Sequence, residues 1–342
     1  MTRSGVHCFS LAVLCLLKIA LAAPAPERYF GFDQSAMRVF RRGEAPVKTT
    51  SSSSATEMEC PYDVISQPGE YFVQSSEAMM CTWLFLTGPS AVVELEITEL
   101  DYPCAEDSFV EFFDGVALQL GVFPTEAGHD LPVQERVNMV CNTGSRVLLS
   151  SQNVAMLTYQ SPANGGAFRL IFKHKTIQAP CNIFSPDSSG AFTLSNFNKQ
   201  KNCSFATIYP GYINVLHMAV GRETNEARLK CKGMTDMVQF AEGNSLELSK
   251  MNIEQRMCGR TGGKSPTGPE GAVPSPADAL HGRDGTAASL VYKKRAQCTS
   301  GITIPLMCQM SVVRLVSSGQ HDNSITFTFT RETGEKNECV SF

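Results

Sequence analysis

The cysteines of this chain fall into two sets of four with similar spacing. The first set is Cys60, Cys81, Cys104 and Cys141, and the second is Cys181, Cys203, Cys231 and Cys258. Successive members are 21, 23 and 37 residues apart in the first set and 22, 28 and 27 in the second. Two four-cysteine sets of similar spacing indicate a duplicated module held by disulfides. The spacing therefore predicts two disulfide-linked modules rather than one large enzyme core.

Residues 1–22 have the pattern of a secretory signal peptide. Arg3 gives a basic start, and an apolar run follows from Cys8 to Ala22, with Lys18 as its only charge. Ala20 and Ala22 stand at the small-residue positions of a cleavage site. No later stretch approaches the roughly 20 apolar residues of a membrane-spanning helix. We therefore expect a secreted, extracellular protein with no membrane association.

The mature chain then has the composition of an extracellular protein. Removing Cys8 and Cys15 from the 13 cysteines leaves 11, and disulfides are the default for cysteines in an oxidising compartment. The cysteines of the two sets lie 21 or more residues apart and no CxxC pair occurs, which disfavours zinc. Loss of Arg3 and Lys18 changes the formal charge from −4 to −6. Such a chain, without a basic cluster, is a poor candidate for binding nucleic acid.

Alternating apolar and polar residues predict β-strands in both modules. Residues 93–98 and 168–172 show this alternation in a first module over 60–176, and residues 325–330 show it in a second module over 181–339. Residues 23–59 are polar and irregular, which predicts a disordered N-terminal segment. The sequence thus predicts an all-β chain of two tandem antiparallel β-sandwiches.

Two further patterns concern the second module. The string of residues 146–152, which contains Ser150-Ser151, is echoed by residues 313–319, which contain Ser317-Ser318. We interpret this echo as the same strand and serine pair in both modules. Residues 259–301 are rich in Gly, Pro, Ser, Ala and Thr, which predicts a disordered insert. Within it, residues 293–295 (Lys-Lys-Arg) are either a processing site or a solvated basic triplet.

The cysteine pattern together with the segment that begins at Cys104 and ends at Asp114-Gly115 resembles CUB domains, which are extracellular jelly-roll β-sandwiches. Three strings, at residues 150–156, 202–210 and 312–319, are similar to the corticotropin-releasing factor-binding protein family. The resemblance covers about 60–258 and 305–339. It implies the disulfides Cys60–Cys81, Cys104–Cys141, Cys181–Cys203, Cys231–Cys258 and Cys308–Cys339, with Cys298 left over. It also raises the expectation of an N-linked glycan at Asn202, in the sequon Asn202-Cys203-Ser204.

The resemblance also bears on metal ions. Many CUB domains bind calcium through three carboxylates, and Asp107 matches one of these positions. Gln152 or Asn153 occupies the place of the last carboxylate, and a site with fewer carboxylates binds calcium weakly. We therefore expect no metal ion and no other cofactor.

The sequence contains none of the common catalytic motifs, so we expect a binding protein rather than an enzyme. The lone Trp83 is expected in the core beside the first disulfide. The resemblance implies a ligand contact at Asp63, which we expect to be exposed, whereas the basic residue expected upstream is absent, with Thr56 near its place.

These features suggest a secreted carrier that sequesters a peptide hormone of the corticotropin-releasing factor or diuretic hormone type and so limits receptor signalling. The alternative is a CUB adaptor protein associated with extracellular matrix or with proteases.

Overall fold

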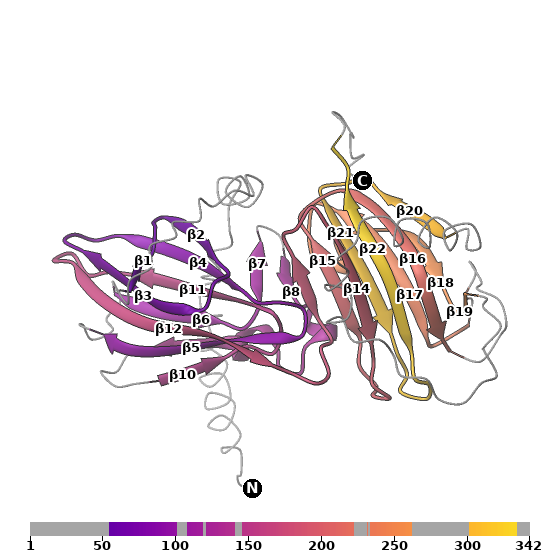
Figure 1. Cartoon of the computed structure of the whole chain (residues 1–342), viewed down its shortest axis with the longest axis horizontal. Helices are drawn as coiled ribbons and strands as arrows, with labels where there is room; N and C mark the ends of the chain where they lie inside the picture. The colour runs from indigo at the N-terminus through magenta and orange to yellow at the C-terminus, as the bar shows by residue number, and fades with distance from the viewer. Residues whose placement is uncertain are drawn as a thin grey trace, which may run out of the picture. The chain divides into compact units, whose positions relative to one another are not determined.

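The computed structural model describes residues 55–100, 108–118, 121–140, 146–221, 231, 233–261 and 301–333. All of these residues belong to one compact unit. The strands form two groups, β1–β12 and β13–β22, which Figure 1 colours from indigo to pink and from pink to yellow. The described helices are three 3-10 turns of three or four residues, so none has the length and apolar character needed to cross a membrane.

The first module is built from two five-stranded sheets and a short hairpin. Sheet A has the order β1-β3-β12-β5-β10, sheet B has the order β2-β4-β11-β6-β9, and β7 pairs with β8. The elements are β1 (Thr56–Glu57), β2 (Tyr62–Ile65), β3 (Gly69–Ser75), β4 (Met80–Leu86), β5 (Ala91–Leu100), β6 (Phe109–Phe113), β7 (Val116–Leu118), β8 (Gly121–Phe123), η1 (Glu126–Gly128), η2 (Val133–Arg136), β9 (Val137–Val140), β10 (Arg146–Leu149), β11 (Val154–Gln160) and β12 (Gly166–Thr176).

The second module repeats this plan. One sheet has the order β13-β15-β21-β17-β18, and the other has the order β14-β22-β16-β19, with β20 also paired to β16. The elements are β13 (Ile183–Ser185), β14 (Ser189–Ser195), β15 (Cys203–Thr207), β16 (Gly211–Val220), β17 (Met237–Gly243), η3 (Leu248–Lys250), β18 (Asn252–Met257), β19 (Gly259–Arg260), β20 (Ile302–Leu306), β21 (Met310–Val316) and β22 (Ser324–Arg331).

The tandem all-β fold is therefore confirmed, with one qualification about strand direction. Most pairs are antiparallel, but β1 with β3, β2 with β4, and β13 with β15 are parallel. The parallel pairs β2–β4 and β13–β15 occupy the same place in the two modules, which supports the duplication.

The interpretation of the serine pairs as topological equivalents was wrong. Ser150-Ser151 lies between β10 and β11, whereas Ser317-Ser318 lies between β21 and β22. The order of the sheets makes β21 the counterpart of β11, since each lies between the strand that contains the second cysteine of its set and the strand that follows the third. The two serine pairs therefore lie at opposite ends of equivalent strands. A short polar string in the sequence does not show whether it precedes or follows a given strand of the fold.

Two boundaries from the sequence analysis also need correction. Residues 56–59 are part of the first module, because Thr56–Glu57 pairs with β3, Met58 is buried and the carbonyl oxygen of Glu59 accepts a hydrogen bond from Trp83 Nε1 at 2.7 Å. Residues 259–261 belong to the second module, since β19 pairs with β16 and Thr261 exchanges hydrogen bonds with Met218. Residues 1–54 and 262–300 lie outside the described residues.

The core of the first module lies between its two sheets. Trp83 is fully buried there, as expected, and contacts Tyr159 and Phe168 at ring-centroid distances of 6.0 and 5.8 Å. The structure contains the disulfides Cys60–Cys81, Cys181–Cys203 and Cys231–Cys258, which are the pairs expected for these six cysteines. The expected bonds Cys104–Cys141 and Cys308–Cys339 include residues outside the described part, and so does Cys298.

A second apolar cluster covers the other face of sheet B. It includes Leu84, Met156 and Phe113 of that sheet, the β7–β8 hairpin, and the core residues of the second module. Phe123 of the hairpin contacts Phe184 of β13 with ring centroids 5.9 Å apart. Sheet B is therefore buried on both faces along part of its length.

The turn into the hairpin gives a prediction about stability. Gly115 has a φ of +134°, and a Cβ there would overlap the carbonyl oxygen of Phe123. We expect Gly115→Ala to lower the free energy of unfolding by about 2 kcal/mol or more, because a side chain is strained at this φ and clashes with backbone. Gly88→Ala is the control, because its Cβ would meet no atom within 4 Å. Urea denaturation followed by fluorescence measures both, and an equal effect of the two substitutions would contradict the assignment.

Candidate ligand-binding site

Asp63, the ligand contact expected from the sequence, lies on β2 beside the first disulfide. Strand β2 is the edge of sheet B, and Asp63 is the register partner of Trp83. Alternation along the strand places Asp63 on the same face as Ile65, which is buried in the module core. The side chain is half-buried rather than exposed as expected, because it points toward the inner face at the rim of the sandwich. Its Oδ1 accepts a hydrogen bond from the N–H of Val64 at 2.7 Å.

The surroundings of Asp63 disfavour its charged form. Burial raises the pKa of the Asp63 carboxyl, the Val64 N–H lowers it, and the negative charge of Glu59 raises it further. Burial also raises the pKa of Tyr71, with a second contribution from the charge of Asp63. The Tyr71 hydroxyl donates to the carbonyl oxygen of Gln67 at 2.6 Å. Asp63 is thus a partly desolvated carboxylate that gains from a hydrogen-bond donor or a cation brought by a ligand.

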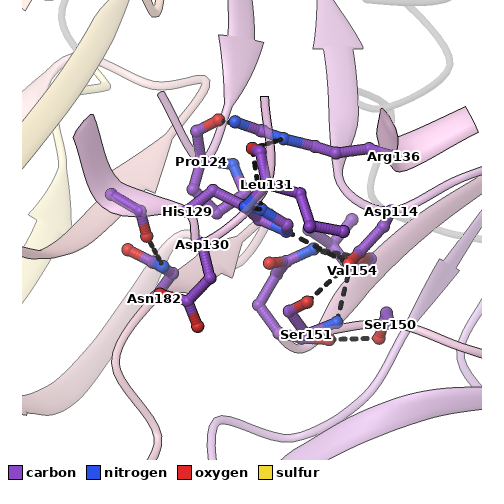
Figure 2. Close-up of polar contacts among 12 residues, drawn as sticks. Asp114, Pro124, His129, Asp130, Leu131, Arg136, Ser150, Ser151, Val154 and Asn182 are labelled. Atoms are coloured by element: carbon purple, nitrogen blue, oxygen red, sulfur yellow. Dashed lines mark hydrogen bonds and ion pairs between the residues drawn. The ribbon is translucent and has the colours of Figure 1, made fainter. Parts of the chain in front are cut away.

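A second polar cluster, which the sequence analysis did not find, surrounds Asp114 at the end of β6 (Figure 2). The N–H and hydroxyl of Ser151 donate to Asp114 Oδ1 and Oδ2 at 2.8 and 2.5 Å, and Gln152 Nε2 donates to Oδ1 at 2.6 Å. His129 Nδ1 accepts the N–H of Leu131 at 2.9 Å, so Nε2 donates to Asp114 Oδ2 at 3.1 Å. All the partners of Asp114 are donors, which is what stabilises a buried carboxylate.

This arrangement differs from a catalytic relay, although it contains Ser, His and Asp. In a nucleophile–base–acid relay, the imidazole lies between the hydroxyl and the carboxylate. Here the hydroxyl of Ser151 and the imidazole of His129 both donate to the same oxygen of Asp114. The imidazole therefore has no contact through which to take the proton of the hydroxyl. The cluster joins three loops rather than activating a nucleophile.

Arg136 extends the cluster to the far end of the hairpin. Its guanidinium is fully buried and donates from Nη1 to the carbonyl oxygen of Pro124 at 2.5 Å and from Nε to that of Leu131 at 3.1 Å (Figure 2). Asp114 precedes the β7–β8 hairpin and Pro124 follows it. The polar cluster therefore fixes both ends of the hairpin.

The second module has a matching cluster around Asp236. The N–H and hydroxyl of Ser318 donate to Asp236 Oδ1 and Oδ2 at 2.9 and 2.8 Å, and Asn323 Nδ2 donates to Oδ1 at 2.7 Å. Burial alone would raise the pKa of Asp236, but the donors from Ser318, Asn323 and Thr235 together lower it. Both serine pairs thus cross-link an aspartate, at opposite ends of equivalent strand pairs.

The residues considered for calcium have other roles. Gln152 bonds Asp114, and Asn153 bonds the backbone of Thr87 and Phe184, with its Nδ2 donating at 3.1 and 2.8 Å and its Oδ1 accepting from Phe184 N–H at 2.8 Å. Asp107 lies outside the described residues. Among the residues that the structure does describe, no three His, Cys, Asp or Glu side chains are grouped to hold a metal ion.

Asn202, the expected glycan site, is half-exposed at the start of β15. Its Nδ2 donates to the carbonyl oxygen of Ala127 at 3.1 Å, and its Oδ1 accepts from the N–H of Ser317 at 3.3 Å. Glycosylation replaces only one of the two hydrogens on Nδ2, so the other remains for the bond to Ala127.

Two family models match the chain, one for each module. The corticotropin-releasing factor binding protein N-terminal domain matches residues 55–176, and the C-terminal domain of the same family matches residues 183–267. The corticotropin-releasing factor-binding protein of Homo sapiens is 30% identical over 275 residues, covering 78% of this chain and 74% of that protein. The protein of the same name from Xenopus laevis is 28% identical over 278 residues, covering 79% and 75%.

Among solved structures, the CUB1-EGF-CUB2 domains of rat MASP-1 resemble the chain at 10% identity, covering 79% of this chain and 99% of that one, with a TM-score of 0.24. A score this low carries no argument, so the fold is defined by its own sheet order.

The sheet order, the disulfides and the duplicated plan define the chain as a disulfide-bonded protein of two tandem β-sandwich modules. The family models cover more than half of its length, in the order of the modules. The chain belongs to the corticotropin-releasing factor-binding protein family.

The Asp236 cluster gives a prediction about stability and pH. We expect Asp236→Asn to lower the free energy of unfolding by about 2 kcal/mol at pH 7, because it replaces a carboxylate oxygen that accepts buried hydrogen bonds. A carboxyl whose pKa is lowered on folding contributes stability above its unfolded pKa and loses it as the pH falls through the folded pKa. The difference in the free energy of unfolding between the wild type and Asp236→Asn should therefore become smaller below about pH 4. Urea titrations at several pH values test this, with the exposed neighbour Asp322→Asn as the control.

Proposed function

We propose that this protein is a secreted carrier that binds a peptide of the corticotropin-releasing factor type and sequesters it from its receptor. The observation that carries the proposal is the family match over both modules, supported by relatives that are named for binding this factor. Ligands of the diuretic hormone type fall within the same proposal. Limiting receptor signalling follows from mass action, since bound peptide is removed from the free pool.

Secretion is supported by the signal-peptide pattern of residues 1–22 and by the disulfides, which persist in oxidising compartments. We further propose that Asn202 carries an N-linked glycan, since the Asn202 side chain of the sequon is half-exposed. The family is one of binding proteins, and we propose that the chain acts without catalysis or a bound cofactor.

An amphipathic helix is the form in which a peptide of this kind would be recognised, with its apolar stripe laid on an apolar surface of the carrier. Asp63 would then accept a donor from the peptide at the rim of the first module. Its raised pKa supports this role, since a partly desolvated carboxylate gains more from a donor than a solvated one does.

The first test of function is direct binding. Isothermal titration calorimetry of the oxidised, full-length secreted protein against synthetic corticotropin-releasing factor should show saturable binding in calcium-free buffer. Reduction of the disulfides should abolish it, because small extracellular modules lose their fold with their bridges. If oxidised protein fails to bind corticotropin-releasing factor and diuretic hormone peptides at micromolar concentration, the carrier proposal is wrong and the matrix or protease-associated adaptor takes its place.

A second test concerns Asp63. We expect Asp63→Asn to raise the Kd for the peptide about tenfold, the effect of losing one charge-assisted hydrogen bond. The melting temperature should not fall, because burial penalises the charged form and asparagine keeps an acceptor for the Val64 N–H. Glu77→Gln, an exposed acid in the same module, should leave the Kd unchanged. Equal affinities of all three proteins would remove Asp63 from the contact surface.

A further inference from the structure

Sheet B has an outer face, turned away from the module core, on which one carboxylate stands out. Val110 and Phe112 of β6 are buried in the core, so Glu111 between them points to the outer face. Its register partners are Thr158 on β11 and Met139 on β9. Glu111 therefore lies near the β9 edge of the sheet, on the face that the hairpin covers only in part.

Glu111 is partly desolvated, and the part of the chain that the structure describes gives it no partner. No described residue forms a hydrogen bond or an ion pair with its carboxylate. Burial raises the pKa of Glu111, and no neighbouring charge contributes to this shift. A half-buried carboxylate without a donor or a cation destabilises the folded chain, and groups of this kind concentrate at functional sites.

On the outer face of sheet A, by contrast, acidic side chains are paired with basic ones. There Lys173 lies 2.8 Å from Glu96 and 3.9 Å from Glu94, and Arg169 lies 3.2 Å from Glu99. The chain thus supplies cations to the acids on one outer face of this module and leaves Glu111 without one on the other. Among the described residues no cation pairs with Glu111, so a basic group of a ligand would meet an unpaired carboxylate there.

Thr158, the register partner of Glu111 on β11, is buried, but two methionines on the same face are accessible. Met139, its cross-strand neighbour, is 42% exposed, and Met80 on β4 is 38% exposed. In the sheet register, Met80 is three strands from Met139 and two residues along, which corresponds to roughly 16 Å for ordinary strand spacing. This is the length of about eleven helical residues, or three turns. Methionine side chains adapt readily to the face of a helix.

We propose that this outer face of sheet B is where the peptide helix binds, with a Lys or Arg beside its apolar stripe paired to Glu111 and the stripe itself on Met139 and Met80. The inference rests on the proposed function and adds a surface and a charge to it. Asp63 lies on the opposite face of sheet B, at its β2 edge, and would be a separate contact of the same peptide. The unpaired carboxylate selects a basic side chain, and the exposed methionines on either side select an apolar face next to it. An amphipathic helix with a basic flank offers both.

The test compares two matched pairs of variants of the full-length protein by calorimetry against synthetic corticotropin-releasing factor. Glu111→Gln should raise the Kd about tenfold, whereas Glu96→Gln, which removes a paired acid from sheet A, should leave it within twofold. Met139→Ala should weaken binding severalfold, whereas Leu149→Ala, a residue 46% exposed on the outer face of sheet A, should not.

The same variants also test whether the substitutions disturb folding. Glu111→Gln removes a charge that burial penalises, so its melting temperature should equal or exceed that of the wild type while its affinity falls. A set of peptides, each with one Lys or Arg replaced by Gln, completes a double-mutant cycle with Glu111→Gln. One of these peptides should bind the wild type weakly and lose nothing further with Glu111→Gln.

The outcomes separate the two proposals. If the wild type does not bind the peptide, the carrier proposal fails. If the wild type binds and Glu111→Gln binds equally well, or Glu96→Gln loses as much affinity, the carrier proposal stands and this surface is wrong.

Discussion

The structure depends on the fact that sheet B is apolar on both faces. One face, with Trp83, forms the core of the first module, and the other carries Leu84, Met156 and Phe113. Exposing that second face to water would forfeit roughly 25 cal/mol for each Å² of apolar surface. The β7–β8 hairpin and residues of the second module cover it, and Phe184 of β13 is held there by Asn153 as well as by contact with Phe123. The two modules therefore share one continuous apolar cluster.

Polar groups hold the β7–β8 hairpin in the position in which it covers the second apolar face of sheet B. Asp114 and Arg136 fix its two ends, and Gly121 at its tip lies so close to the 245–247 loop that a Cβ would be 2.8 Å from the backbone nitrogen of Glu247. Each group that contacts the Asp114 carboxylate is a donor, whereas Glu111, three residues earlier in β6, has no donor among the described residues. Acids of the same module are thus used in two ways. Asp114, with its set of donors, stabilises the fold, whereas half-buried Glu111, for which the described residues provide no donor, destabilises the free protein.

The sequence predicted the features that depend on local pattern. Alternation over residues 93–98 located β5, because Val93, Leu95 and Ile97 face the core while Glu94 and Glu96 face water. It did not locate the covered face of sheet B, since β4 and β11 are buried along nearly their whole length and show no alternation. The Asp114 cluster was missed because its members are up to 38 residues apart. His129 has no distinctive neighbours in the sequence, and only the folded loops bring it to Asp114. Asp63 was misjudged as exposed because its partial burial depends on the side to which an edge strand turns.

The order of strands in the second module has a consequence for the integrity of the chain. β21 and β22 are inner strands of its two sheets, yet they follow the long segment between Thr261 and Gly301. A break of the backbone within that segment would leave both strands hydrogen-bonded to β15, β17, β14 and β16. The two pieces would behave as a split protein, separate on a denaturing gel and joined in a native one. The same position would accept new chain termini in a circular permutant, because none of the described strands would lose a partner there.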